Sequence, residues 1–462
     1  MNICGDHDMS SSILQIKPET LNVTEARGKF TVSIMGCEQT GVLHAALLAE
    51  AGFKVICVNA NQTIIDQLTR GRAPFIKPET QVKLKNYVKT ACINATTDAK
   101  TALSQSDIIF ITTPVNIDDK QKPDYSNLEN TCKQTGSSLR RGSLVIITST
   151  VGVGVIESLV KETLENTSGL KVGVDLGLAY SPAGNASKIL ETSENRKRIV
   201  ATTDKSSLEV ASAIMETIFG KNVLRTESIK TAEAATLFEV IQRNVTSSLA
   251  NEFALFCEKA GIDYLEASRL VTPTVSLPML ADYYAQVESY LLLEDAENLN
   301  AKLRIPKTAL ESNEEMVGHV TNLARDALRN CGKTLRRARI SLLGVSQTPN
   351  MKDSPRKVLE ELVKMLEAKG AKVGLYDPYF SNDELAEMRS HYKNNLNEAL
   401  EGVDCIMILT GHDQYKRLNL KKLKIIMKTP AVIIDLVGIM EPDKVEKEGF
   451  TYRGLGRGVW TK

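Results

Sequence analysis

Residues 30–61 read FTVSIMGCEQTGVLHAALLAEAGFKVICVNAN, and this stretch decides the fold. An apolar strand at Thr31–Met35 leads through a Gly-x-x-x-x-Gly turn into an apolar helix, and a second strand follows at Lys54–Val58. This order is typical of the first unit of a dinucleotide-binding Rossmann domain. Gly36 suits the tight turn, and Gly41 allows the helix to lie close to the strand.

The turn departs from the dinucleotide fingerprint at two positions. Glu38 occupies the place of the middle glycine, so a carboxylate stands where bare backbone should approach a pyrophosphate. Asn59 follows the second strand, where an acidic residue usually binds a ribose hydroxyl. The pattern therefore predicts the fold more strongly than it predicts a bound dinucleotide.

The composition is that of a globular protein with balanced charge. The 462 residues suffice for about three domains. The formal net charge of +1 gives no electrostatic argument for a nucleic acid or an anionic membrane as partner. No apolar run approaches the roughly 18 residues that span a bilayer, and the polar segment Met1–Ser12 does not read as a signal peptide. We therefore expect a cytoplasmic protein with neither kind of partner.

The eight cysteines are scattered singly along the chain. None forms a Cys-x-x-Cys pair, and no His/Cys cluster has metal-ligand spacing. The sequence predicts no metal site, and we interpret most of the thiols as small buried side chains in a reducing compartment.

The chain divides into an N-terminal extension (1–29), an alternating α/β block (30–226), a helical block (227–330) and a second alternating block (331–462). Strands are predicted at Val32–Met35, Val55–Val58, Ile108–Thr112, Leu144–Thr148, Val172–Leu178, Ile199–Ala201, Ile340–Leu343, Val373–Tyr376, Cys405–Leu409 and Val432–Asp435. The helical block contains one long predicted helix with an apolar face, Thr231–Gly261, and a further helix is predicted at Ser354–Glu367 with Pro355 in its first turn. The fold class is therefore α/β: two Rossmann-like, doubly wound domains joined by a central helical segment.

Several short motifs recur in one order along the chain. They are Thr113-Pro114 with KPDYSNLENT (122–131), STVGVG (149–154), LAYSP (178–182), LANEFALFCEKAGID (249–263), VGLYDPY (373–379), ILTGHDQYKRL (408–418) and YRGLGRG (452–458). In this order the chain resembles the nucleotide-sugar 6-dehydrogenases of the UDP-glucose/GDP-mannose dehydrogenase family, and especially the branch that oxidises UDP-N-acetylhexosamines. The resemblance covers nearly everything after residue 30.

The resemblance implies NAD as cofactor, a nucleotide-sugar ligand, and a homodimer that forms through the central helix. It also implies a cysteine nucleophile, a lysine and an asparagine on the helix, and a glutamate after Ser-Pro. The corresponding positions here are Leu277, Thr236, Val240 and Ala183. No cysteine occurs between Cys257 and Cys331, and Thr348–Pro355 replaces the family's substrate-binding motif in a shortened form without its lysine and arginine.

Other residues could in principle replace the missing groups. Cys257 lies mid-helix in an apolar pattern, so we interpret it as a core residue. Lys230 and Glu233 lie near Thr236 on the helix, but neither has the i±4 spacing that would place it on the same face. His412, in the TGHDQ segment, resembles a histidine that the family carries, and we expect a structural or substrate-loop role for it.

We therefore predict no catalytic residues, and a vestigial cofactor cleft lined by Gly36, Gly41, Asn59, Thr113 and Thr150. The preferred hypothesis is a pseudoenzyme that acts as scaffold, regulator or binding partner in polysaccharide or glycan biosynthesis. One alternative is an active NAD-dependent UDP-sugar dehydrogenase with relocated catalytic groups. The other is a nucleotide-sugar binder that does not oxidise its ligand.

Overall fold

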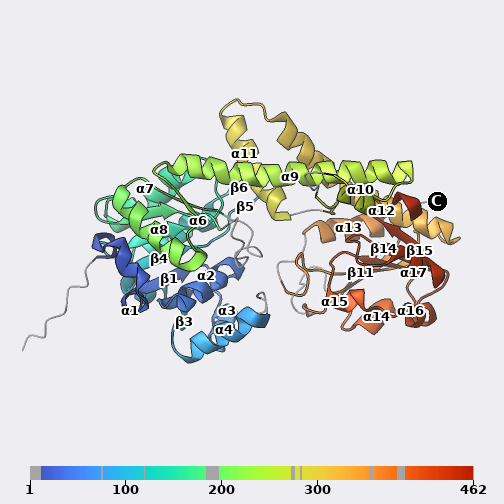
Figure 1. The fold of residues 1–462 in the computed structure, drawn as a ribbon, viewed down its shortest axis with the longest axis horizontal. Helices are drawn as coiled ribbons and strands as arrows, with labels where there is room; N and C mark the ends of the chain where they lie inside the picture. Colours follow the sequence, from blue (N-terminus) through green and yellow to red (C-terminus); the bar gives the residue numbers. More distant parts are fainter. Residues whose placement is uncertain are drawn as a thin grey trace, which may run out of the picture. The chain divides into compact units, whose positions relative to one another are not determined.

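The structure is a computed structural model that describes residues 12–73, 76, 78–118, 120–183, 197–271, 276–280, 283–352, 357–381 and 391–460. The chain forms two compact units (Figure 1). Unit 1 comprises Met1–Glu239 and Tyr290–Asn298. Unit 2 comprises Val240–Ser289 and Leu299–Lys462. Each unit is built on its own largely or wholly parallel sheet, which confirms the predicted α/β class with two Rossmann-like domains.

The sheet of unit 1 has eight strands in the order β10-β9-β8-β7-β4-β1-β2-β3. Their bounds are β1 Thr31–Met35, β2 Lys54–Val58, β3 Ile93–Thr96, β4 Ile108–Ile111, β7 Leu144–Ile147, β8 Gly177–Tyr180, β9 Arg198–Thr202 and β10 Val223–Thr226. Neighbouring strands are parallel except β8 and β9, which are antiparallel. The order β3-β2-β1-β4-β7-β8 is that of a Rossmann fold. Successive strands are added on one side of β1 and then on the other, so the strand order reverses between β1 and β4.

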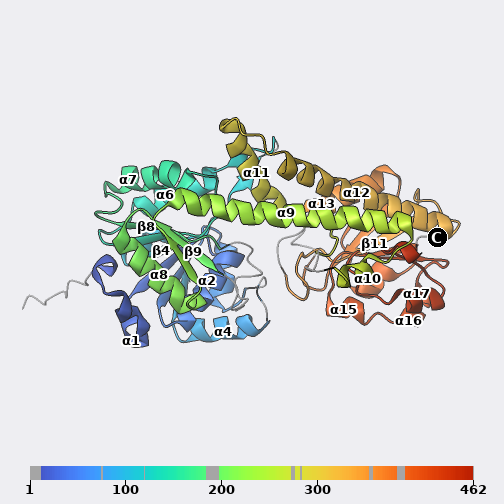
Figure 2. The same ribbon diagram turned by 45° about the horizontal axis from the view of Figure 1, so that its top comes forward.

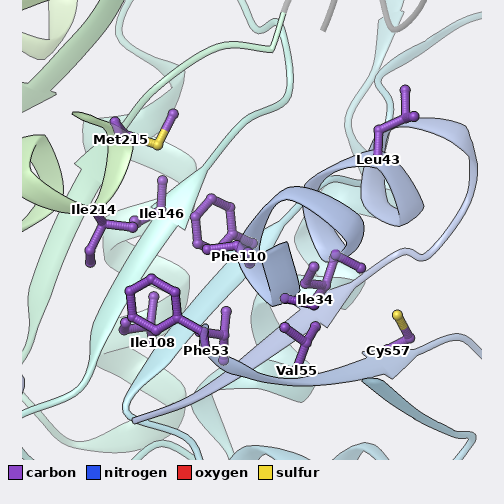
Figure 3. Close-up of a cluster of buried hydrophobic side chains, with 14 of the residues drawn as sticks. Ile34, Leu43, Phe53, Val55, Cys57, Ile108, Phe110, Ile146, Ile214 and Met215 are labelled. Carbon is purple, nitrogen blue, oxygen red and sulfur yellow. The ribbon is translucent and has the colours of Figure 1, made fainter. Parts of the chain in front are cut away.

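Helices cover both faces of this sheet because alternate strand residues point to opposite sides. On one face α2 (Gln39–Glu50) and α8 (Lys205–Phe219) pack on a core that includes Ile34, Val55 and Phe110 (Figure 3). On the other face α5 (Ala99–Ser104), α6 (Ser126–Gly136), η3 (Ile156–Val160) and α7 (Lys161–Ser168) cover a second cluster. The remaining elements of the first α/β block are α3 Gln62–Thr69, α4 Pro78–Lys89, β5 Asn116–Ile117 and β6 Pro123–Asp124.

The segment before β1 is folded onto unit 1. It forms η1 (Ile13–Gln15), η2 (Pro18–Asn22) and α1 (Thr24–Arg27). Ile13 and Leu21 are fully buried in the same core as α2 and α8. The Ser12 hydroxyl donates to the carbonyl oxygen of Gly142 at 3.0 Å, and the Ser206 hydroxyl donates to that of Leu14 at 2.7 Å. This segment therefore contributes to the core of unit 1.

Unit 2 contains a five-stranded parallel sheet in the order β12-β11-β13-β14-β15. Its strands are β11 Arg339–Leu343, β12 Lys372–Tyr376, β13 Cys405–Ile408, β14 Val432–Asp435 and β15 Thr451–Gly454. One face packs against α12 (Arg304–Asn330) and α13 (Lys357–Ala368). The other packs against α14 (Leu396–Leu400), α15 (Asp413–Lys416), α16 (Leu420–Ile426) and α17 (Pro442–Lys447). A short helix, η7 (Gly458–Trp460), follows β15.

The central helix α9 (Ile229–Ala260) has 32 residues. It is the long helix labelled in Figure 2. Gly261 follows it with a φ of +70°, which suits a helix C-terminus. It is followed by α10 (Tyr264–Arg269) and α11 (Tyr283–Asn298). One side of α9 is buried, whereas Phe238, Leu249, Phe253 and Phe256 are exposed.

The strand prediction at Val172–Leu178 is wrong for its first half. The structure has a turn there, with Gly173 at φ +80° and Val174 82% exposed, and β8 begins only at Gly177. The alternation of apolar residues in this segment is typical of a strand, but the Val174 side chain is exposed and packs against no core. Strands β3, β5, β6, β10 and β15 were not predicted. The start of the predicted helix Ser354–Glu367, including Pro355, lies outside the described residues.

Candidate functional site

The carboxyl edge of the unit 1 sheet gathers four of the five predicted cleft residues. Gly36 follows β1, Asn59 follows β2, Thr113 lies two residues after β4, and Thr150 lies three residues after β7. These four strands are consecutive neighbours in the sheet. In open α/β sheets this edge, at the point where the strand order reverses, is where ligands bind.

The two glycines of the turn are required by close backbone packing. Gly36 has φ +88°, and a Cβ built on it would lie 3.3 Å from the backbone nitrogen of Thr113. A Cβ on Gly41, in the first turn of α2, would lie 2.6 Å from the carbonyl oxygen of Gly36. Both positions therefore keep the geometry of a phosphate-binding turn.

Glu38 changes the chemistry of that turn. It is the residue before α2, its side chain is exposed, and it makes no capping hydrogen bond. Its backbone N–H donates to the carbonyl oxygen of Gly36 at 2.8 Å. The N-terminus of α2 is the place where backbone N–H groups would meet a pyrophosphate. Because a carboxylate stands there, the residues present do not fit the pyrophosphate of NAD.

The polar side chains at the other strand ends bond within the chain. The Asn59 Oδ1 accepts from the Asn61 backbone N–H at 2.9 Å. The hydroxyls of Thr113 and Thr131 lie 3.1 Å apart, and the Ser149 hydroxyl donates to the carbonyl oxygen of Thr113 at 2.5 Å. Asn59, Thr113 and Thr150 are all half-buried.

The loop after β7 is held by Tyr125, Asp295 and Glu233; of these, sequence reasoning singled out only Glu233, as a possible substitute near Thr236. The N–H of Gly152 donates to the Tyr125 hydroxyl at 3.1 Å, and the N–H of Val153 donates to Asp295 at 2.7 Å. The N–H groups of Gly154 and Ile156 donate to the two oxygens of Glu233, at 2.6 and 2.9 Å. These backbone N–H groups of the loop are therefore already bonded to side chains of the same chain.

Burial shifts the pKa values of these acceptors. It raises the pKa of Glu233 to about 7, with the Glu157 and Asp295 charges adding to the effect, although the two backbone N–H bonds work in the opposite direction. Burial likewise raises the pKa of Asp295 and brings that of Tyr125 to about 12. Lys122 pairs with Glu294 and, at 3.2 Å, with Glu297, so it partly balances the negative charge nearby.

On α9 the two positions for which the resemblance implies a lysine and an asparagine carry no cation. The Thr236 side chain is buried, and its hydroxyl donates to the Ala232 carbonyl oxygen at 2.8 Å. Val240, one turn further, is also buried. Lys230 lies at the outer end of the loop: a Cβ built on Gly154 would be 3.5 Å from its Cε, and its largely exposed ammonium lies 3.9 Å from Glu157.

Cys257 lies in a small buried cluster with Ala250, Ala254 and Tyr264. Its side chain is 6% exposed, and burial raises the pKa of its thiol. A high thiol pKa leaves little of the reactive thiolate at neutral pH. The cluster and the raised pKa both match its interpretation as a core residue.

The carboxyl edge of the unit 2 sheet contains a buried polar network around Asp377. Its Oδ2 accepts from the N–H groups of Val345 and Ser346, at 2.8 and 3.0 Å, and from the Ser346 hydroxyl at 2.9 Å. His412 Nδ1 accepts from the N–H of Asn350 at 2.9 Å, so Nε2 carries the proton and donates to Asp377 at 3.1 Å. Burial acts to raise the pKa of Asp377, but the bonds from His412 and the backbone lower it overall. His412 thus fastens the loop after β11.

Within the described residues no group of His, Cys, Asp and Glu side chains has the arrangement of a metal site. In the same part of the chain, no helix is both long and apolar enough to cross a membrane.

Two family models match the chain. The NAD binding domain of the UDP-glucose/GDP-mannose dehydrogenase family matches residues 30–219, and the UDP binding domain of that family matches residues 341–442. Together the two matches cover more than half of the chain. The chain belongs to the UDP-glucose/GDP-mannose dehydrogenase family.

Individual relatives of this chain include several UDP-N-acetyl-D-mannosamine dehydrogenases. A UDP-N-acetyl-D-mannosamine dehydrogenase of Methanococcus maripaludis is 26% identical over 442 residues, which are 93% of this chain and 97% of the relative. One from Pyrococcus horikoshii is 28% identical over 436 residues, or 92% and 99% of the two chains. The solved structure of the UDP-D-ManNAc dehydrogenase of Pyrococcus horikoshii is similar at a TM-score of 0.80 and 26% identity, covering 93% of this chain and 100% of that one.

Two further positions for which the resemblance implies catalytic residues, Ala183 and Leu277, lie within the described residues. Ala183 is buried, and its carbonyl oxygen accepts from Arg198 at 3.0 Å. Leu277 is 57% exposed in the short described segment before α11. Thr348 and Asn350 of the shortened C-terminal motif are described, whereas residues 353–356 are outside the described part of the chain.

Proposed function

We propose that this chain no longer oxidises nucleotide sugars and acts as a scaffold or regulator in polysaccharide or glycan biosynthesis. One observation carries the proposal: α9 presents Thr236 and Val240, both buried, where the family resemblance implies a lysine and an asparagine. A buried hydroxyl bonded to its own helix offers no positive charge to a developing oxyanion, and such stabilisation is a major part of catalysis. The absence of cysteine between 257 and 331 points the same way.

The support at the cofactor turn is electrostatic. Glu38 stands at the N-terminus of α2, where it would repel a pyrophosphate, so we propose that NAD binds weakly or not at all. Gly36, Gly41, Asn59, Thr113 and Thr150 remain the proposed lining of this cleft. An active enzyme with relocated groups would need a new thiolate, and Cys257 is buried with a raised pKa.

The activity test is NADH formation at 340 nm with UDP-glucose, UDP-N-acetylglucosamine and UDP-N-acetylmannosamine. The Pyrococcus horikoshii relative serves as the positive control for the assay. We expect no turnover above background for this chain. Turnover would overturn the proposal, and its loss in Cys257→Ser would then identify that thiol as the nucleophile.

A second candidate function is nucleotide-sugar binding without oxidation. It is favoured by the Asp377 network, which fixes the loop after β11 at the edge where a ligand of unit 2 would bind. Calorimetry with UDP and UDP-N-acetylglucosamine separates the two candidates. A binder gives a saturable heat with the UDP-sugar, whereas a scaffold gives none.

We further propose a homodimer that uses α9, located in the cytoplasm. The exposed phenylalanines of α9 form an apolar stripe on one side of the helix, which is the kind of surface that a second copy covers. The compartment is proposed because all cysteines in the described part of the chain are free thiols, as a reducing environment maintains them.

A further inference from the structure

The net charge of the whole chain is near zero, but within unit 2 positive charges are concentrated in two segments. The segment 333–339 reads KTLRRAR and carries four cations without a carboxylate. The segment 416–428 reads KRLNLKKLKIIMK and carries six cations, again without a carboxylate. Both segments lead into strands of the five-stranded sheet, β11 and β14.

Hydrogen bonds bring the first segment and the end of the second together at the amino edge of that sheet. The Arg337 N–H donates to the carbonyl oxygen of Gly370 at 2.7 Å, which places it beside Lys369 and Lys372 at the start of β12. The Lys333 ammonium donates to the carbonyl oxygen of Lys428, just before β14. We call the exposed cations of 333–339, 369–372 and 421–428 the basic edge.

Helix C-termini explain part of this charge. In a parallel α/β sheet the helices end at the amino edge, and cations there complement the negative ends of their dipoles. Unit 1 has the same architecture, and at this edge Arg140 pairs with Asp107 at 2.8 Å and Arg141 with Asp175, whereas exposed Lys29, Lys54 and Lys89 form no ion pair within the described residues.

In unit 2 most of these cations have no ion-pair partner among the described residues. Lys333 pairs with Asp404 at 2.7 Å. No described carboxylate forms an ion pair with Arg336, Arg337, Lys369, Lys372, Lys421, Lys424 or Lys428. Together these cations give this surface of unit 2 the charge of a docking site for an anion.

Helix α16 adds an apolar component. Leu423 is buried and anchors the helix to unit 2, whereas Ile425 is 84% exposed. Exposed Lys421, Lys422 and Lys424 surround it in sequence. A protruding aliphatic side chain among lysines is typical of segments that lie in the interface of a bilayer.

We propose that the basic edge docks unit 2 on an anionic lipid bilayer surface. A nucleic acid is less well matched, because the segments 333–339 and 416–428 contain no aromatic residue on which bases could stack. The proposal concerns the edge opposite the Asp377 network, so it is independent of catalysis and of ligand binding in either unit.

The test is flotation of the full chain with vesicles at about 50 mM and about 300 mM NaCl. Vesicles of phosphatidylcholine alone are compared with vesicles that contain about 30% phosphatidylglycerol. We expect binding to the anionic vesicles at low salt, little at high salt, and none to phosphatidylcholine. The triple variant Lys421→Gln, Lys422→Gln, Lys424→Gln should lower the partition coefficient roughly 100-fold, and Ile425→Ser should lower it at both salt concentrations.

A matched control removes three exposed lysines of unit 1, with Lys89→Gln, Lys100→Gln and Lys205→Gln, and should bind like the unmodified chain. Circular dichroism melts verify that the variants fold, and Arg336→Gln with Lys369→Gln provides a second variant on other elements. Absence of binding to anionic vesicles at low salt overturns the proposal. It is also overturned if the control loses as much binding as the triple variant. Tighter binding to a duplex oligonucleotide than to the vesicles, with the same dependence on α16, would identify a nucleic-acid surface instead.

Discussion

At the scale of a single residue, Glu38 is the proposed cause of weak NAD binding. Its carboxylate stands at the N-terminus of α2, in a turn whose glycines keep the geometry for a pyrophosphate. Removing one charge at a few Å from a diphosphate relieves roughly 1–3 kcal/mol of repulsion. We therefore expect Glu38→Gly to raise NAD affinity about tenfold or more, as measured by calorimetry, and Asn59→Asp to add to the gain.

Glu38→Gln separates charge from size, because it keeps the atoms and removes the charge. An affinity gain equal to that of Glu38→Gly identifies repulsion as the cause, whereas a gain with glycine alone identifies crowding. Micromolar affinity for NAD in the unmodified chain would contradict this account of the turn.

Glu233 gives unit 1 a pH dependence. Burial raises the pKa of Glu233 to about 7 in the folded chain, compared with about 4.3 in an unfolded one. Between these values the folded state holds more protons than the unfolded state. The contribution of this group is therefore fully present below the lower value and is lost as the pH rises through the upper one. The free energy of unfolding should fall by up to about 3 kcal/mol from this group across that window.

Glu233→Gln is neutral throughout this range and should remove the pH dependence. The measurement is the guanidinium midpoint, followed by circular dichroism, for both proteins at about pH 5 and pH 7.5. Any misfit of the amide with the Gly154 and Ile156 donors acts at both pH values and cancels in the comparison. If the guanidinium midpoints of the two proteins differ by the same amount at both pH values, Glu233 stays ionised over the whole range.

At the scale of an element, α9 divides into a buried side and an exposed apolar stripe. Phe238 and Phe256 are 61% and 65% exposed, and Leu249 lies between them on the same side. If a second copy covers this stripe, Val245→Asp with Leu249→Lys should dissociate the dimer, because charges cannot be buried unpaired at the contact. Light scattering at roughly tens of micromolar protein measures the mass.

The matched control places the same two charges on α6 of unit 1, with Asn127→Asp and Asn130→Lys, and should leave the mass unchanged. A monomer in the unmodified chain at that concentration would rule out the homodimer and weaken the scaffold proposal.

The N-terminal segment is a second element with a measurable role. Leu21 is fully buried against α2 and α8, so Leu21→Ala should lower the free energy of unfolding by about 2–5 kcal/mol. Denaturant unfolding followed by circular dichroism checks this value. Val23→Ala is the control, because Val23 is 51% exposed and should cost little. Equal effects would show that the segment does not pack in solution.

At the scale of the whole molecule, the fold followed from local patterns. The strand–turn–helix of residues 30–61 predicted the Rossmann unit because β1, β2 and α2 are continuous and strongly apolar, and this fold class is confirmed. β3 and β15 are short and contain polar residues, so they lack the apolar run that identifies a buried strand.

The candidate site was less predictable because its contacts join distant parts of the chain. Asp295 reaches Val153 across 142 positions, and Glu233 reaches Gly154 across 79. No local spacing signals such pairs. The glycines of the turn were visible in the sequence because backbone conformation is a local property, whereas the acceptors of the loop after β7 depend on the tertiary fold.

The placement of Tyr290–Asn298 in unit 1 also bears on how the protein is made. A ribosome synthesises Val240–Ser289, which belongs to unit 2, before it reaches this last piece of unit 1. Nascent domains generally fold as they emerge, starting from the N-terminus. Here the first unit cannot complete its contacts, including Asp295 on Val153 and Glu294 on Lys122, until part of the second has left the exit tunnel. The two units therefore finish folding in an interleaved order during translation.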